Sequence, residues 1–155
     1  MNMTLAAIIL AALTSSVADK TGPDTAVRHL TGKELGETLQ KGMTPEAPYS
    51  QVLLAKHDGY EIHITVRNKS GLAEMHDNWN DHIFIQKGRA SFIIGGIAVD
   101  AKVTAPGEKR GTGIRGGTTM VVQPGDYLFI PAGTPHQMIV EPGQRAQFIG
   151  LRTPK

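Results

Sequence analysis

The sequence has no cysteine in its 155 residues, which excludes disulfide bonds, thiolate metal ligands and thiol nucleophiles. Aromatic residues make up only 5% of the chain, and the net charge of +2 leaves little excess of either sign. No basic block with interleaved aromatic residues is present, so nucleic acid is not an expected partner. The Gly-x-Ser-x-Gly pattern of a serine hydrolase is also absent. Histidine and carboxylate side chains remain as candidates for chemistry.

The amino-terminal segment carries no charge over its first 18 residues. Its apolar run, residues 5–13, is well short of the ~20 residues that a membrane-spanning helix needs. Two small residues, Ser16 and Ala18, occupy the positions that a signal peptidase reads, and Asp19 begins a polar region. We therefore expect residues 1–18 to be a signal peptide rather than a retained anchor. The remaining single domain would be secreted or periplasmic, with no membrane contact after cleavage.

A short helix is expected in the polar leader that follows, residues 19–47. Thr31 and Glu34 match a capping box, in which the two side chains satisfy free amides at a helix start. The helix should run from about Gly32 to Lys41, with Gly42 as its C-terminal stop. We expect it to pack on the outside of the domain formed by residues 48–155.

Short strands separated by glycine and proline turns dominate the rest of the chain. Tyr49–His57 and Tyr60–Arg67 are joined by Asp-Gly, which is a strong hairpin signal. In the second of these strands apolar and polar residues alternate, so we expect the apolar face to be buried and His63 to lie on the surface. Further strands are expected at His82–Gln86, Ala90–Ile94, Thr118–Val122, Tyr127–Ile130, Gln137–Val140 and Ala146–Leu151. This pattern predicts an all-β domain, either a barrel or a sandwich.

One glycine-rich segment, residues 105–117, interrupts this pattern. We expect it to be a flexible, solvated hairpin loop. The alternative is a mobile lid in which Lys109, Arg110 and Arg115 offer positive charge to an anionic substrate.

The most informative segment ends in a histidine that follows a proline and a glycine. Pro131 cannot donate to a strand ladder, so the strand before it should end there. Gly133 can adopt a positive φ, which lets the chain turn back sharply. His136 then lies at the mouth of a strand, where it is a candidate metal ligand or acid–base group.

This segment resembles the second motif of the cupin family. That motif is a glycine, five residues, a proline, one residue, a glycine, two residues and a histidine. Gly125, Pro131, Gly133 and His136 fill each of those places. The resemblance implies that residues 48–155 form a cupin domain, a small antiparallel barrel or jelly roll whose interior often holds one divalent metal.

The first cupin motif is matched in a degraded form. Its pattern is two histidines one residue apart, then a glutamate and a glycine at fixed spacing. Gly88 matches the glycine, and counting back places Asp81 at the glutamate, His76 at the second histidine and Glu74 at the first. The resemblance thus implies a metal site made of Glu74, His76, Asp81 and His136.

Two imidazoles combined with carboxylates suit iron, manganese, nickel, copper or zinc. On a strand, Glu74 and His76 would point to the same face. We expect Asp81 to come from the neighbouring strand and His136 from the other sheet or the other side of the barrel. Asp81 is one methylene shorter than the usual glutamate, so Glu74 is expected to be either the third ligand or the general base beside the metal.

His82 is the rival ligand because it neighbours Asp81. Adjacent residues of a strand face opposite sides, so only one of the two can point inward. The motif spacing favours Asp81 inside and His82 on the outer face, at a dimer contact. Tyr127 and Phe129 are expected to be packing residues.

The resemblance implies a secreted, single-domain metalloenzyme that acts on a small molecule, by dioxygenase, isomerase, lyase or decarboxylase chemistry. The alternative is a barrel that binds a sugar or a small organic acid without turnover. The resemblance also implies a homodimer that pairs strands and thereby covers sheet edges.

Overall fold

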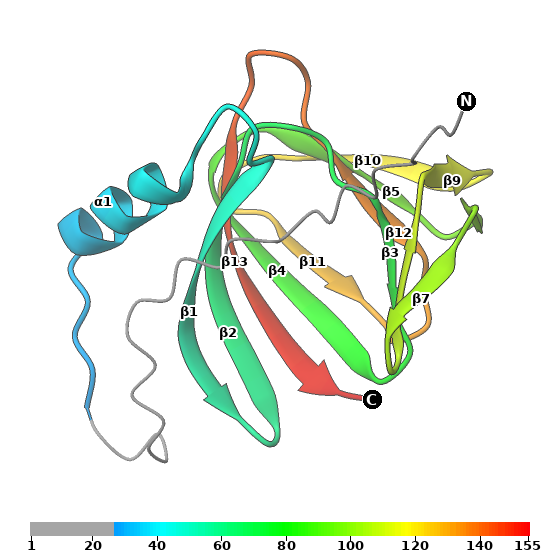
Figure 1. Ribbon diagram of the computed structural model, residues 1–155, viewed down its shortest axis with the longest axis horizontal. Helices are drawn as coiled ribbons and strands as arrows, with labels where there is room; N and C mark the ends of the chain where they lie inside the picture. The colour runs from blue at the N-terminus through cyan, green and yellow to red at the C-terminus, as the bar shows by residue number, and fades with distance from the viewer. Residues whose placement is uncertain (1–26) are drawn as a thin grey trace, which may run out of the picture.

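The computed structural model describes residues 27–155, so the predicted signal peptide and the start of the leader lie outside the described residues. A single helix, α1 (Gly32–Gly42), precedes a series of short strands in this part of the chain (Figure 1). The strands are β1 (Tyr49–His57), β2 (Tyr60–Arg67), β3 (Ala73–His76), β4 (Trp79–Gly88), β5 (Ala90–Ile94), β6 (Ile97–Val99), β7 (Lys102–Ala105), β8 (Glu108–Gly111), β9 (Gly113–Arg115), β10 (Thr118–Val122), β11 (Tyr127–Ile130), β12 (His136–Ile139) and β13 (Ala146–Pro154). No helix within residues 27–155 has the length and apolar character needed to cross a membrane.

The strands form two main antiparallel sheets. One has five strands in the order β1-β2-β13-β4-β11, and the other has six in the order β10-β5-β12-β3-β8-β7. A two-stranded ribbon, β6-β9, stands beside them. Figure 1 shows the two sheets facing each other, with α1 outside the five-stranded sheet. The prediction of an all-β, jelly-roll-like fold with a short amino-terminal helix is confirmed.

Most strands lie where their alternating pattern places them, but the glycine-rich segment does not form the expected loop. Residues 108–111 are strand β8, which pairs with β3 on one side and β7 on the other. Residues 113–115 are strand β9, which pairs with β6. The expected hairpin is present, since β7 and β8 pair across residues 106–107, but it is not a solvated loop because β8 also pairs with β3 inside the six-stranded sheet. The low strand propensity of glycine, lysine and glutamate hides this pairing in the sequence.

Two apolar clusters stabilise the fold. The larger cluster fills the space between the sheets at one end of the barrel, around Ile85, Phe92 and Ile130, none of which is more than 2% exposed. The smaller cluster lies outside the five-stranded sheet, where Leu39 of α1 packs on Val52 of β1 and other apolar residues. The helix therefore covers the outer face of the sheet and leaves the inner face to the barrel.

On strand β2, the apolar face points outward to the helix and the polar face points into the barrel. Ile64 and Val66 point outward and are buried beneath α1. The intervening residues point into the barrel: His63 pairs across the sheet with Gly150, and Thr65 pairs with Phe148, which packs on the larger cluster. The side chain of His63 is only 19% exposed, so its predicted surface position was wrong. The helix buries the apolar face from outside, which leaves the polar face to line the interior.

The start of α1 has the predicted capping box. The Thr31 side chain accepts from the Glu34 amide at 3.2 Å, and the Glu34 carboxylate accepts from the Thr31 amide at 2.8 Å. At the other end Gly42 is the last helical residue, and Met43 caps the helix in an extended conformation. A Cβ at Gly42 would overlap the side chain of Ser50. Glycine is therefore required here by the close approach of β1, and not by the left-handed turn that a helix stop usually uses.

Candidate metal centre

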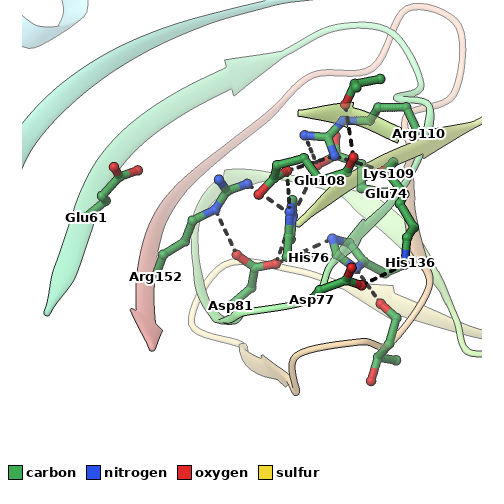
Figure 2. A network of polar contacts seen from close by, with 12 residues as sticks. Glu61, Glu74, His76, Asp77, Asp81, Glu108, Lys109, Arg110, His136 and Arg152 are labelled. Carbon is green, nitrogen blue, oxygen red and sulfur yellow. Dashed lines mark hydrogen bonds and ion pairs between the residues drawn. The ribbon is translucent and has the colours of Figure 1, made fainter. Parts of the chain in front are cut away.

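The four predicted ligands come together at the polar end of the barrel. Glu74 and His76 lie on β3, His136 begins β12, and Asp81 lies on β4. Figure 2 shows their side chains converging on one region. The predicted placement by sheet was reversed: β12 pairs directly with β3, with His136 opposite Glu74, whereas Asp81 belongs to the opposing sheet. The chain crosses from one sheet to the other between β3 and β4, so closeness in sequence does not mean the same sheet.

The donor atoms are spaced as ligands of one ion would be. His76 Nε2 lies 3.4 Å from Asp81 Oδ2 and 3.6 Å from Glu74 Oε2. His136 Nε2 lies 3.5 Å from the same Asp81 oxygen. Single donor atoms of Glu74, His76 and His136 all fall within 4.8 Å of one another. Two ligands bound at ~2.1 Å to a tetrahedral ion stand ~3.4 Å apart, so these spacings fit a metal with little rearrangement.

Glu108 and Thr134 fix the orientation of the two histidines. His76 Nδ1 lies 2.6 Å from a Glu108 oxygen and, because a carboxylate only accepts, it carries the proton and donates. His136 Nδ1 donates in the same way to the Thr134 carbonyl at 3.0 Å. Both rings therefore turn an unprotonated Nε2 toward the centre, as a metal requires. Burial also lowers the pKa of His136, although the Thr134 carbonyl and Asp81 oppose this, so the neutral ring is favoured.

Glu74 is held as a carboxylate. Burial by itself raises the pKa of Glu74, but the close His76 side chain and the positive charge of Arg110 outweigh burial and hold this pKa at about 2. The same Oε2 that approaches His76 also lies 3.6 Å from Arg110 Nη2. An ionised oxygen directed at two imidazoles is the state that a metal ligand needs.

Two arginines complete the network. Arg110, on β8, donates to Glu108 at 3.0 Å. Arg152, on β13, donates from Nε to Asp81 Oδ1 at 3.2 Å and from Nη2 to His76 Nε2 at 3.1 Å (Figure 2). Since arginine can only donate, the second bond confirms that His76 Nε2 is unprotonated. This bond uses the same lone pair that a metal would use, so an ion entering the site displaces one hydrogen bond.

The other face of β4 carries the rival histidine. His82 points outward, where Nδ1 lies 2.8 Å from the Tyr127 hydroxyl and Nε2 lies 3.1 Å from the Thr153 hydroxyl. Asp81 is inside and 8% exposed, as the motif spacing predicts. Tyr127 and Phe129 are not core packing residues as expected, because they are 53% and 47% exposed and surround His82 on the outer face.

Sequence reasoning missed Glu108 and Arg152, which shape the centre, and named Arg110 only as a cation of a possible lid. Glu108 and Arg110 fall in the segment expected to be a loop, and their spacing of two, which puts both on one strand face, was the available signal. Arg152 lies one residue beyond the predicted end of the last strand, whose alternation with Phe148 and Gly150 points it inward. Lys109 faces away from the imidazoles and pairs with Asp77 at 2.9 Å.

No protein-family model and no curated protein matches this sequence, but solved structures match the fold. The polyketide cyclase RemF from Streptomyces resistomycificus is 20% identical, with a TM-score of 0.50 over 69% of this chain and 65% of the cyclase. KdgF from Halomonas sp. is 15% identical, with a TM-score of 0.51 over 73% of this chain and 86% of KdgF. A cupin superfamily protein from Desulfitobacterium hafniense is 15% identical, with a TM-score of 0.52 over 76% and 89% of the two chains.

This chain has the cupin fold. Such neighbours confirm the resemblance that the two motifs indicate, at the level of architecture. The match spans just under two thirds of the cyclase, and identities of 20% or less carry no activity from these proteins to this one. What this protein does must therefore be argued from its own residues.

Proposed function

We propose that this cupin binds one divalent metal ion through Glu74, His76 and His136, with Asp81 completing the site, and uses it on a small-molecule substrate. The observation that carries the proposal is the convergence of the Glu74, His76 and His136 donor atoms within 4.8 Å. Glu108 supports it, because a carboxylate that holds the far nitrogen of an imidazole is the usual outer partner of a metal-bound histidine.

The donor set of nitrogen and oxygen atoms suits iron, manganese, nickel, copper or zinc. Such an ion supplies Lewis-acid or redox chemistry to a molecule bound at its open positions. The reaction classes that we propose are dioxygenase, isomerase, lyase or decarboxylase. Neighbours of similar fold include proteins described as a polyketide cyclase, a DMSP lyase and a putative mannose-6-phosphate isomerase, each of which names an enzyme of small molecules.

Glu74 is the residue whose role the next experiment decides. Its position opposite His136 and its distance of 3.6 Å from His76 Nε2 favour a ligand over a general base. Glu74→Gln keeps the size of the side chain and removes its charge. We expect Zn²⁺ affinity, measured by competition with a chromophoric chelator, to fall about tenfold or more, as changes at and around metal ligands do.

The matched control is Glu141→Gln, an exposed glutamate in a turn far along the chain. This variant should bind Zn²⁺ as the wild type does. Unchanged affinity in Glu74→Gln would leave Glu74 as the base and move the third ligand to Asp81. A wild-type protein that binds no Zn²⁺, Fe²⁺, Mn²⁺, Ni²⁺ or Cu²⁺ would contradict the proposed function itself.

Export and self-association form a second part of this proposal. The uncharged apolar segment supports cleavage after Ala18, which mass spectrometry of the exported protein tests; an intact Met1 would refute it. The exposed aromatic residues around His82 on the edge strand β11 support a homodimer. Sedimentation equilibrium should give twice the chain mass, and a monomer at all concentrations would contradict the dimer.

A further inference from the structure

Arg152 and Arg110 enter the same site with different partners. Arg110 donates to Glu108 at 3.0 Å and to the Lys109 carbonyl at 2.9 Å, and its Nη2 lies 3.6 Å from Glu74. Its charge is thus shared between two carboxylates. Arg152 has one carboxylate partner, Asp81, and its other bond goes to the neutral imidazole of His76. Of the two guanidinium groups, Arg152 is the one with less compensated charge.

A bound metal would change the surroundings of Arg152 further. His76 Nε2 has one lone pair, so an ion that takes it releases Arg152 Nη2 from its hydrogen bond. The link from Nε to Asp81 can remain, which keeps the guanidinium beside the ion. The freed N–H groups are then available to another acceptor, since the Arg152 side chain is 28% exposed.

The charge balance of the site indicates what that acceptor would be. Three carboxylates, those of Glu74, Asp81 and Glu108, are opposed by the guanidinium groups of Arg110 and Arg152. The buried guanidinium of Arg67 also acts on Glu74. A divalent ion adds two positive charges to this group, so an anionic ligand would offset part of that charge in a partly buried site, where unbalanced charge is costly.

The inner wall beside Arg152 is open at one position, Gly150. Phe148 and Arg152 both point inward from β13, so Gly150 between them also faces the interior. A Cβ placed on Gly150 would meet no atom within 4 Å. Across the sheet this position is flanked by His63 on β2 and Ile83 on β4. The missing side chain therefore leaves a space next to the guanidinium.

We propose that Arg152 and the space over Gly150 form a subsite for a small organic carboxylate. The inference rests on the proposed metal site. The guanidinium fork donates to the carboxylate, as arginine does in planar, bidentate recognition, and the body of the ligand lies over Gly150 between His63 and Ile83. The ligand class is accordingly a small monoanion, whose carboxylate lies beside the metal.

The test uses the purified protein loaded with Co²⁺, whose visible absorption reports both the occupancy of the site and changes at the ion. Propionate is the probe and propionamide is its neutral counterpart. We expect propionate to shift the Co²⁺ spectrum of the wild type and propionamide to have little effect. Arg152→Met keeps the length of the side chain without its donors, and should weaken propionate binding about tenfold or more, because a charge-assisted hydrogen bond is lost. Co²⁺ binding should be retained, since the thioether side chain of this variant has no N–H group to compete for His76 Nε2.

Three further variants and a control make the test specific. Gly150→Leu fills the proposed space and should weaken propionate binding to a similar extent while Co²⁺ still binds. Gly150→Ala should fold as the wild type does, because its Cβ meets no neighbour within 4 Å. Arg89→Met removes an exposed arginine outside the network and should bind propionate normally. If Arg152→Met does not fold, Arg152→Lys keeps the charge, removes the fork and should show a smaller loss.

The outcomes separate this inference from the metal site. Normal Co²⁺ binding together with unchanged propionate affinity in the Arg152 and Gly150→Leu variants would overturn the carboxylate subsite and leave the metal site standing. Equal affinity of the wild type for propionate and propionamide would overturn it as well. A wild type that binds no Co²⁺ would contradict the proposed function, and the subsite would fall with it.

Discussion

The two ends of the barrel interior are built from the same strands but differ in chemistry. Strand β4 carries Asp81 at the polar end and Ile85 in the apolar cluster. On β12 His136 points to the metal centre, and Met138, two residues later, packs in the core. Strand β13 runs the other way, from Phe148 beside the core to Arg152 beside His76. Along the inward face of each of these strands, a core residue and a residue of the metal centre lie two or four positions apart.

This difference implies that one end of the barrel provides stability and the other end holds the metal ligands. The apolar end removes large side chains from water and supplies stability. The polar end contains charges that must be paired, and such groups add little net stability but hold ligand atoms in place. Substitutions at the apolar end should then change the free energy of unfolding but not metal affinity. Substitutions at the polar end should change metal affinity and have little effect on unfolding.

The largest effect is expected at the apolar end. Phe92 is 2% exposed in the larger cluster, and Phe92→Ala would leave a cavity there. The free energy of unfolding should fall by ~3–5 kcal/mol, measured by urea denaturation. The fraction that stays folded should bind Zn²⁺ with wild-type affinity. Loss of metal affinity in that folded fraction would show that the two ends are not separable.

The reverse effect is expected for Glu108→Gln at the polar end. The amide can no longer hold His76 Nδ1 as a charged acceptor, so Zn²⁺ affinity should fall by ~10–100-fold. Stability of the metal-free protein should change much less than in Phe92→Ala. Glu46→Gln, an exposed glutamate in the segment between α1 and β1, is the matched control. Wild-type affinity in Glu108→Gln would contradict the proposed support of His76.

A smaller effect is expected outside both ends, at the helix cap. Thr31→Ala removes the side-chain acceptor for the Glu34 amide and should cost about 1 kcal/mol in thermal or urea unfolding. Thr31→Ser keeps the acceptor and should behave as the wild type. Neither variant should alter metal affinity, and a change there would mean that α1 supports the site through β1.

The smallest expected effect is a pH dependence of the free energy of unfolding, caused by His63, which points into the barrel. Burial lowers the pKa of His63, and the nearby Glu61 carboxylate only partly opposes this. The unfolded chain therefore takes up the proton first, so the free energy of unfolding should decrease as the pH falls below about 6.5. His63→Gln should make this decrease shallower in the metal-free protein. An equally steep or steeper decrease would contradict the inward position of His63.

Much of the fold could be predicted from short-range patterns. The bounds of β1, β2, β5, β10 and β11 follow from alternation and from turns that contain glycine or proline, such as Asp58-Gly59 and Pro124-Gly125, and the capping box marks the start of α1. What alternation cannot give is which side of a strand faces the barrel. On β2 the apolar face packs under a helix that comes from elsewhere in the sequence, so His63 was placed on the wrong side.

The residues of the candidate site that belong to the two motifs could be predicted from the sequence. Counting from Gly88 and Gly125 brought Glu74, His76 and His136 to one place. Glu108 and Arg152 were missed because their positions depend on long-range pairing: β8 exists through its bonds to β3 and β7, and Arg152 meets His76 only across the two sheets. The strand propensity of a short segment does not predict either of these long-range contacts.

The most direct test of the metal centre is the metal content of the wild type beside that of His136→Ala. His136 is 6% exposed and turns Nε2 toward Asp81, whereas His57 is an exposed histidine on the hairpin and provides the control His57→Ala. Elemental analysis should find about one divalent metal per chain in the wild type and in His57→Ala, and far less in His136→Ala. Equal metal content in all three proteins would contradict the assignment of the centre to these residues.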